Sequence, residues 1–434
     1  MTTMETSTER PQRSAMILGV GSFAQSAMGI LQEAGARVGC FLNRDYGHYG
    51  PAQAGPTWTG EEDPFLFEAL EAFRPDFLIP MSIDWHTAPW REKLVETGIP
   101  ILCPQGEAMR LEADRDFAGK LCAEAGIHVP RSFRVKNRLD ALRVMREEPR
   151  PYVIKNPLCS PYSPVHTIVC ETVEDTLGWL DRVDYAEGVF LQEYIGTAEI
   201  GHFAFVSGGE VVSLATNQEY KRAFNGNMGP VAGAPLAGIA EQDPDDRYGL
   251  CAALIRPLLP WLKQTGFHGP LQVTAIQQNG RWMPIEYNVR LGSTTGAMLL
   301  RMVENPAEVL HQVSRNEVPN MRWKPSNAYG ASLTLAGFGY PFRIPEVPPL
   351  PVRVSEPLSC DLWWNEVVTH DDGLYMEDHS GVETGHRIAD VVACADTLEA
   401  AIAEVKREIS KLRCLGSYYR TDLGESLWPP GRGF

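Results

Sequence analysis

Two short stretches of alternating apolar and polar residues, 271–276 and 282–287, stand out along this chain of 434 residues. A polar turn at 277–280 separates them and ends in Asn279-Gly280. Asn-Gly between two such stretches is the strongest short-range signal for a β-hairpin. Because side chains alternate between the two faces of a strand, the second strand presents one polar row. The members of this row are Glu286, Asn288 and Arg290.

The polar row combines a carboxylate, an amide oxygen and a guanidinium group, and Gln272 on the partner strand adds a fourth polar side chain. Mg²⁺ prefers oxygen ligands, typically one or two carboxylates together with substrate phosphates, and an always-charged arginine suits phosphate oxygens. The same pattern is typical of a surface hairpin with a solvated polar face. The residues alone leave both interpretations open.

The N-terminal part alternates between short apolar strands and helices. Strands are expected at 15–18 and 36–42, with a helix that ends at residue 34 between them, and again at 75–81 and 98–103. This order is typical of a parallel sheet covered by helices on both faces. We therefore expect a three-layer α/β domain at 14–104, preceded by a disordered tail at 1–13.

The middle of the chain predicts a smaller, antiparallel unit. Strands are expected at 152–155, 167–171 and 189–194, with a helix near 176–180. This order indicates a small lid, at about 127–195. A meander follows, in which strands at 203–206 and 211–214 are joined by the turn Ser207-Gly208-Gly209.

Residues 19–24 read GVGSFA, which fits the GxGxxA fingerprint of dinucleotide-binding folds. Asp45 lies near the distance at which an acidic ribose ligand would follow. This pattern favours a nicotinamide-linked oxidoreductase as a rival function. A single GxGxxA is weak evidence, however, because any tight turn from a strand into a helix recruits glycine.

Composition restricts the function classes. The formal net charge of −16 should repel nucleic acid and anionic lipid, although a local basic cleft for ATP is compatible with it. No apolar run approaches the roughly 20 residues that cross a bilayer, and the polar N-terminus is unlike a secretory signal. The nine cysteines are scattered without metal spacing, which favours reduced thiols in the cytoplasm.

The stretch IEYNVRLG, at 285–292, resembles the (I/V)E-x-N-x-R-x-G signature of the ATP-grasp carboxylate–amine ligases. Other segments resemble, in the same order, motifs of the glycinamide ribonucleotide synthetases within that superfamily. The hinge LQEYIGTAE resembles EEFL-x-G-x-E, NQEYKRAFNGNMGP resembles QDHKRAFDGDxGP, and YYRTDLG resembles YxRxDIG. GVETGHRIADVV follows the TxGGRVLxV segment. The resemblance extends over residues 14–424.

The resemblance implies ATP and Mg²⁺ (or Mn²⁺) as cofactors, and it implies roles for individual residues. Metal ligands would be Glu286, Asn288 and Gln272. The catalytic cations facing the phosphates would be Arg290, Lys221 and Arg222. ATP would be bound by Arg115, Lys155, Glu193, Ile195 and Glu199. Arg115 stands where the family usually has lysine, so a planar fork replaces a point charge.

The departures from the family concern the lid loop and the substrate. The glycine-rich loop GLAAGKG is here LCSPYSPVH, at 158–166, which has no glycine. Ser160, Ser163 or His166 would have to contact phosphate through side chains. The first loop GGREH of the family corresponds here to GSFAQ, at 21–25. The family's RFGDPE motif corresponds here to RLGSTT, at 290–295. The corresponding candidate substrate residues are Ser22, Asp84, Ser293 and Thr294.

We therefore expect a cytoplasmic ATP-grasp ligase with an α/β and α+β architecture. Its domains would be the N-terminal one, an ATP-grasp domain at 105–328, and a C-terminal α+β domain at 329–425 before a tail at 426–434. It would join a small-molecule carboxylate to an amine, on a substrate pair other than phosphoribosylamine and glycine, as a monomer or homodimer without nucleic-acid or membrane partners. Two alternatives stay open: a true glycinamide ribonucleotide synthetase, and a non-catalytic ATP-binding protein.

Overall fold

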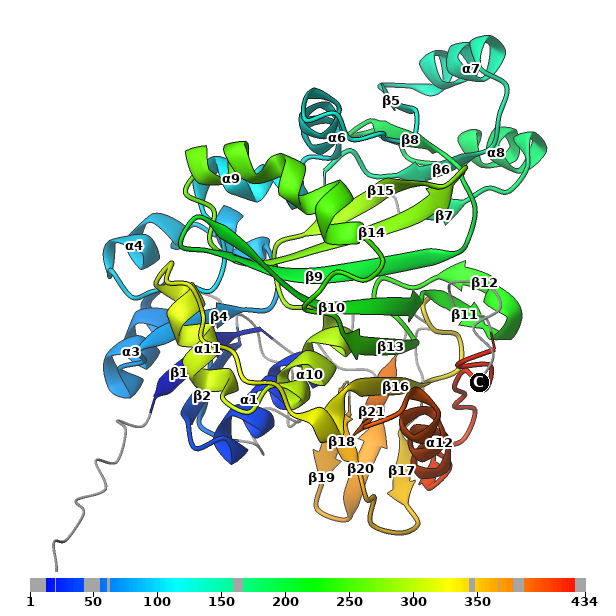
Figure 1. Ribbon diagram of the computed structural model, residues 1–434. Coiled ribbons are helices and arrows are strands. Elements are labelled where there is room, and N and C mark those ends of the chain that lie inside the picture. Colours follow the sequence, from blue (N-terminus) through cyan, green and yellow to red (C-terminus); the bar gives the residue numbers. More distant parts are fainter. Residues whose placement is uncertain are drawn as a thin grey trace, which may run out of the picture.

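The computed structural model describes residues 13–19, 21–42, 55–60, 63–158, 167–342, 348–365, 367–377 and 386–425. Several sequence predictions fall elsewhere: Asp45, Ser160, Ser163, His166, residues 1–12 of the N-terminal tail and the tail at 426–434 lie outside the described residues. Figure 1 shows an N-terminal parallel sheet, a long central sheet, a small lid sheet and C-terminal strands. This arrangement confirms the predicted α/β and α+β fold class.

The N-terminal sheet is parallel, in the order β3-β2-β1-β4. Its strands are β1 (Ser14–Leu18), β2 (Arg37–Leu42), β3 (Thr57–Thr59) and β4 (Phe77–Pro80). Its helices are α1 (Gly21–Glu33), α3 (Asp63–Phe73) and α4 (Arg91–Glu96). The strand expected at 98–103 is reduced to one parallel bridge between Leu78 and Ile101. Pro100 and Pro104 lack amide donors, which prevents a longer ladder on this side.

The central sheet has eight strands, in the order β15-β14-β9-β10-β13-β16-β21-β18. They are β9 (Glu199–Ser207), β10 (Glu210–Tyr220), β13 (Ala237–Gln242), β14 (Gly269–Gln278), β15 (Arg281–Asn288), β16 (Tyr329–Ala336), β18 (Asp361–Trp364) and β21 (Arg387–Ala395). β16, β21 and β18 come from the expected C-terminal domain, so the boundary expected at 328/329 lies between the paired strands β13 and β16.

β14 and β15 form the predicted hairpin. Gln278 pairs with Arg281, and the two turn residues have φ of 51° (Asn279) and 75° (Gly280). Positive φ at both positions is the type I′ geometry that Asn-Gly favours. The register shifts between Thr274 and Ala275, which leaves Ile285 as a bulge on β15. The bulge turns the Ile285 carbonyl towards the lid, as shown below.

The lid sheet is antiparallel, as predicted, with the order β5-β8-β6-β7. Its elements are β5 (Ser132–Val135), α7 (Arg138–Glu147), β6 (Tyr152–Lys155), β7 (Ile168–Val169), α8 (Val173–Leu180) and β8 (Val189–Glu193). Asn137 and Thr172 accept hydrogen bonds from backbone amides and cap the two helices. The lid has its own small core, which includes Tyr152 and Leu191.

The remaining elements connect or cover the sheets. They are α5 (Arg110–Ala113), α6 (Arg115–Glu124), β11 (Arg222–Phe224), β12 (Met228–Val231), α9 (Leu259–Gln264), α10 (Ser293–Met302), α11 (Pro306–Ser314), β17 (Leu350–Val354), β19 (Val368–His370), β20 (Gly373–Met376), α12 (Leu398–Ile409) and β22 (Leu412–Arg413). α10 packs against both α1 and the central sheet, and α12 covers β16 and β21.

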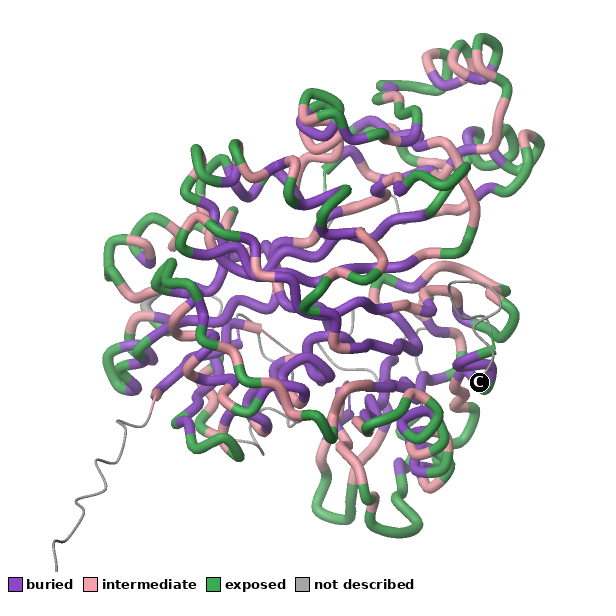
Figure 2. Tube along the Cα trace, in the orientation of Figure 1, coloured by how far each residue is buried: buried purple, intermediate pink, exposed green. Residues whose placement is uncertain are grey.

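Burial follows the layers: the inner strands of both large sheets are mostly buried, whereas the edge strands β3, β15 and β18 are only partly buried (Figure 2). Within the described residues, no helix is long and apolar enough to cross a membrane. The cysteines of the described part of the chain are free thiols, five of them buried.

Candidate active site

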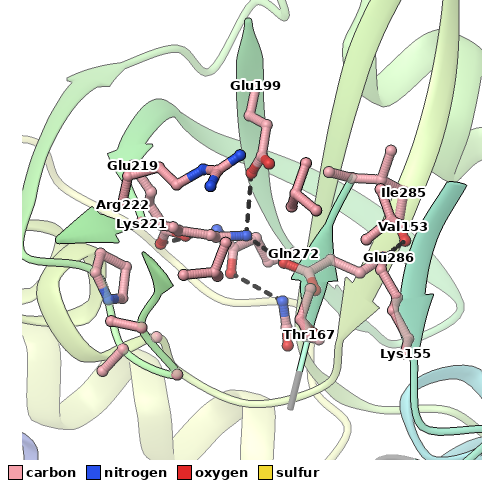
Figure 3. Close-up of a pocket in the computed structure, with 18 of the residues that line it drawn as sticks. Val153, Lys155, Thr167, Glu199, Glu219, Lys221, Arg222, Gln272, Ile285 and Glu286 are labelled. Atoms are coloured by element: carbon pink, nitrogen blue, oxygen red, sulfur yellow. Dashed lines mark hydrogen bonds and ion pairs between the residues drawn. The ribbon is translucent and has the colours of Figure 1, made fainter. Parts of the chain in front are cut away.

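A cavity of about 750 Å³ is lined by residues of the lid, the central sheet and the N-terminal domain. Of the expected site residues that the structure describes, all but two line it. These are Asp84, Arg115, Lys155, Glu193, Ile195, Glu199, Lys221, Arg222, Gln272, Glu286, Asn288, Arg290 and Ser293. The exceptions are Ser22 and Thr294. Figure 3 shows the charged centre of this cavity.

Three carboxylates converge on the ammonium of Lys221 (Figure 3). Its Nζ lies 3.2 Å from Glu199 Oε2 and 3.8 Å from Glu219 Oε2, and it donates a hydrogen bond to Glu286 Oε1. Burial alone would lower the pKa of Lys221, but the three carboxylates raise this pKa well above its usual value. Burial would raise the pKa of Glu286, yet Lys221 and Lys155 hold it well below the usual value. This centre therefore carries fixed, opposite charges at neutral pH.

Gln272 and Asn288 lie directly opposite each other on β14 and β15. Asn288 Nδ2 donates to Gln272 Oε1 at 3.4 Å, and Glu286 is on the same face of β15, two residues before Asn288. Gln272 Nε2 in turn donates to Glu219 Oε1 at 3.5 Å. One carboxylate and two amide oxygens thus gather on one wall, which is a donor set that suits a hard divalent cation.

Sequence reasoning missed Glu219. It lies two residues before Lys221, so both point to the same side of the chain where it leaves β10. Its carboxylate accepts hydrogen bonds from Gln272 and from Thr295 Oγ1, the latter at 3.4 Å. Burial raises the pKa of Glu219, while Lys221 lowers it. The period-2 alternation in NQEYK could have indicated this residue, since Asn217, Glu219 and Lys221 share one face.

Lys155 is buried at the end of the lid strand β6. Its Nζ donates to Gln192 Oε1 at 2.8 Å and to the bulged Ile285 carbonyl at 3.3 Å. Burial, with Arg115 as the next cause, lowers the pKa of Lys155 to about 8. Both hydrogen-bond partners are neutral, so the lysine keeps a positive charge to offer a ligand anion.

Arg290 follows the end of β15 and contacts both Glu112 and Asn288. Its Nε is 3.2 Å from Glu112 Oε1, and its Nη2 donates to Asn288 Oδ1 at 3.4 Å. Glu112, on α5, also accepts the Val289 amide at 2.6 Å. Burial raises the pKa of Glu112, and Arg290 opposes that rise. The sequence does not reveal a role for Glu112, because nothing in its local pattern shows that it would meet Arg290.

Four further predicted residues line the cavity around this centre. Arg115 begins α6 and donates to the Asn156 carbonyl at 2.9 Å. Glu193 ends β8, with Oε1 at 2.5 Å from Arg150 Nη1, and Ile195 follows before β9. Arg222 donates to the Gly229 carbonyl at 2.9 Å and to Glu171 at 3.2 Å. The lid and the central sheet together therefore bring five cationic side chains to one cavity.

Residues 113–295 match the family model described as phosphoribosylglycinamide synthetase, ATP-grasp (A) domain. Phosphoribosylamine–glycine ligase of Streptococcus pneumoniae is 24% identical over 346 residues, which cover 76% of this chain and 79% of that protein. The Mycobacterium leprae protein of the same name is 28% identical over 346 residues, which cover 76% of this chain and 78% of that protein. The chain is an ATP-grasp ligase.

Solved structures agree on the ATP-grasp fold. Phosphoribosylamine–glycine ligase of Thermotoga maritima has a TM-score of 0.71 at 20% identity, over 94% of this chain and 99% of that one. A second match is the biotin carboxylase domain of the Hydrogenobacter thermophilus 2-oxoglutarate carboxylase, in complex with MgADP, ADP and bicarbonate. Its TM-score is 0.69 at 12% identity, over 95% of this chain and 92% of that one.

Of the four residues expected to contact substrate in this ATP-grasp ligase, two line the cavity and two do not. Ser293 begins α10 and lines the cavity, and Asp84 lines it while accepting a hydrogen bond from Ser82 Oγ at 3.0 Å. Ser22 is buried and donates to Asp390 Oδ2 at 2.5 Å. Thr294 is buried too, with its hydroxyl facing Gly238 of β13. Ser22 and Thr294 thus lie behind the cavity wall.

The glycine turn that suggested a dinucleotide site is covered by the C-terminal strands. A Cβ at Gly21 would lie 2.6 Å from Asn365 Oδ1, and Asn365 Nδ2 donates to Ser22 Oγ at 3.3 Å. Asn365 therefore occupies the start of α1, where a bound pyrophosphate would meet the backbone amides. This contact argues against the nicotinamide-linked alternative.

A second cluster of ligand-type side chains lies outside the cavity lining: His202, Asp243 and Asp246. The ring nitrogens of His202 lie 3.0 Å from Thr216 Oγ1 and 2.8 Å from Ser213 Oγ. The Asp246 carboxylate accepts the amides of Cys251 and Ala252. Ser213, Thr216 and nearby backbone amides already satisfy these groups, so the cluster ties β9 and β10 to the turn that follows β13.

Proposed function

We propose that the chain is an ATP-dependent carboxylate–amine ligase that forms an amide bond through an acyl phosphate. We further propose that its substrate pair differs from phosphoribosylamine and glycine. One observation carries the proposal: the Glu286, Asn288 and Gln272 oxygens share a single cavity with Lys155, Lys221 and Arg290. The relatives named above support the reaction class.

Two group transfers make up the proposed reaction. A carboxylate oxygen of the acid attacks the γ-phosphorus of ATP, the bond to the β-phosphate oxygen breaks, and ADP leaves. The amine nitrogen then attacks the carbonyl carbon of the acyl phosphate, the carbon–oxygen bond to phosphate breaks, and the amine loses a proton. Phosphorylation is needed because a carboxylate repels nucleophiles and has no good leaving group.

The chain's own cations would stabilise the charge that develops during phosphoryl transfer. Lys155 approaches from the lid and Arg290 from the central sheet, so the transferring group would be held from two sides. Arg115, Arg222, Glu193, Ile195 and Glu199 would position the nucleotide. Their present hydrogen bonds fix most of these side chains before ATP arrives, which reduces reorganisation.

Glu286, Asn288 and Gln272 would hold Mg²⁺, because their oxygens lie together on one wall of the cavity. When bound with ATP, the ion neutralises charge on the phosphates and orients them. Lys221 now contacts the Glu286 carboxylate. We infer that Lys221 turns towards the phosphates when the metal and nucleotide bind.

The domain limits given above, 14–104, 105–328 with a lid at about 127–195, and 329–425, are retained as proposals. Two alternative functions are retained as well. The names of the relatives favour phosphoribosylamine–glycine ligase activity. The glycine-free lid loop, at 158–166, favours a protein that binds ATP without turnover.

The test is ADP release by purified protein with Mg·ATP. Phosphoribosylamine plus glycine would be compared with a pool of amino acids, amines and small carboxylates, with Glu286→Ala as the blank. We expect ADP only with the pool, at least 100-fold above the blank. Turnover of phosphoribosylamine and glycine would instead establish the relatives' activity. ATP binding by calorimetry without ADP from any mixture would favour the non-catalytic alternative.

A further inference from the structure

The N-terminal domain forms one end of the cavity, and this end is largely apolar. Phe23 on α1 lines it together with Met81 and Ile83, which follow β4. β1 and β4 are hydrogen-bonded neighbours, so the start of α1 and the segment after β4 lie side by side at the carboxyl edge of the sheet. Ala232, Ala234 and Pro235, which follow β12, line the cavity as well.

The usual phosphate site of such a fold, the first turn of α1, is closed. Asn365 lies against Gly21 and donates to Ser22, as described above, and Ser22 in turn donates to Asp390. Ser22, Asn365 and Asp390 are each nine-tenths or more buried. A substrate phosphate could reach the α1 amides only if Asn365 moved away and left buried polar groups without partners.

The segment 232–235 is fixed from behind by a buried arginine. Arg387 Nη1 donates to the carbonyls of Ala234 (3.1 Å) and Pro235 (2.9 Å), and its Nη2 donates to Asp390 Oδ1 (3.0 Å). This arginine is therefore engaged with backbone and Asp390. Lys221 and Arg222, which lie beside the start of the segment, are engaged as well: Lys221 with three glutamates, and Arg222 with Glu171 and the Gly229 carbonyl. The apolar side chains of the segment are held in place towards the cavity.

The charges at this end are unsuited to a phosphate. Among the described cavity residues of 23, 81–84 and 231–235, Asp84 is the only charged one. A dianion placed here would face a carboxylate and an apolar wall, which is costly, whereas an ammonium group would be attracted. Phe23 also stands where the resembling family has an arginine, so the sequence departs in the same direction.

Resting on the proposed function, we propose that this end of the cavity binds the amine substrate, and that this amine carries an apolar, unphosphorylated substituent. Phe23, Met81 and Ile83 enclose the substituent, with Ala232, Ala234 and Pro235 opposite. Asp84 draws the ammonium form towards the site. The residues that would bind ATP and metal are unaffected by this assignment.

Calorimetry with Mg²⁺ and a non-hydrolysable ATP analogue tests the inference on the full chain. The matched probes are 3-methylbutylamine and 2-aminoethyl phosphate, with L-leucine and O-phospho-L-serine as a second pair. We expect the apolar member of one pair to bind at least tenfold more tightly than its phosphorylated partner. Equal affinity, a preference for phosphate, or binding of neither member of either pair would overturn the inference.

Two variants localise the preference. Phe23→Arg should weaken apolar amine binding at least tenfold and improve binding of the phosphorylated partner, and Ala234→Arg should act in the same direction from the opposite wall. Phe342→Arg, at an exposed phenylalanine, is the matched control and should change neither. Thermal unfolding identifies a variant that fails to fold. Failure of the wild type to bind the ATP analogue would contradict the proposed function itself, and a reversed preference with intact analogue binding would contradict only the inference.

Discussion

The Lys221 ammonium lies 3.2 Å from the Glu199 carboxylate, and Glu219 and Glu286 approach the same nitrogen. One lysine thus balances three glutamates that come from β9, β10 and β15. Without it, these carboxylates would repel one another across a largely buried site.

Lys221→Met should therefore destabilise the fold by about 2 kcal/mol, because breaking a buried ion pair leaves an uncompensated charge. Lys221 keeps some exposure, so the cost should lie below that of a fully buried pair. Urea unfolding would measure it. Lys120→Met, which removes an exposed pair with Asp116, should leave stability essentially unchanged. Equal effects of the two substitutions would contradict the role of Lys221 as a counter-ion.

Glu219→Gln should weaken metal binding about tenfold. Glu219 accepts a hydrogen bond from Gln272 and adds negative charge beside the metal wall, so its neutral analogue would lower the attraction for a cation. Titration of the protein with Mn²⁺, followed by its paramagnetic signal, measures the affinity without turnover. Glu210→Gln, at the exposed start of the same strand, is the control. An unchanged Mn²⁺ affinity in Glu219→Gln would sink the prediction.

ATP affinity should fall as the pH rises through about 8. Burial lowers the pKa of Lys155 to about 8, so its positive charge is lost there rather than near 10.5. Between these two values the unfolded chain binds the additional proton, so this group makes the folded state more stable as the pH rises from 8 towards 10.5. Affinity for an ATP analogue, measured from pH 7 to 9.5, should decline in the wild type and stay flat in Lys155→Met. A flat profile in both proteins would refute the assignment.

Asp390→Leu should destabilise the protein by about 3 kcal/mol, since it leaves Arg387 buried without its carboxylate. It should also raise KM for the amine more than it changes kcat, because segment 232–235 would lose its fixed support. Asp390→Asn keeps part of the hydrogen bonding and should lie between wild type and Asp390→Leu. Asp245→Leu, at an exposed position, serves as the surface control. A kcat loss with unchanged KM would contradict the positioning role.

Local patterns predicted much of this fold. The Asn279-Gly280 turn and the alternation on both sides of it placed Gln272, Glu286 and Asn288 on one wall, since a hairpin is set by residues close in sequence. Glu112 and Asp390 were missed, because their partners Arg290 and Ser22 are 178 and 368 residues away, respectively. Ser22 was expected at the substrate but is buried behind the wall. No local pattern shows which side of a loop will be covered by a distant strand.

The continuous central sheet has a consequence for protein engineering. β13 pairs with β16, and α10 packs against both strands, so the C-terminal quarter shares backbone hydrogen bonds with the part that would bind ATP. A hybrid joined to a relative at residue 328 would have to rebuild that ladder from strands of different parents. Exchange of loops at the strand ends would leave the ladder intact. The substrate preference of such a protein can therefore be recombined far more readily through its loops than through its domains.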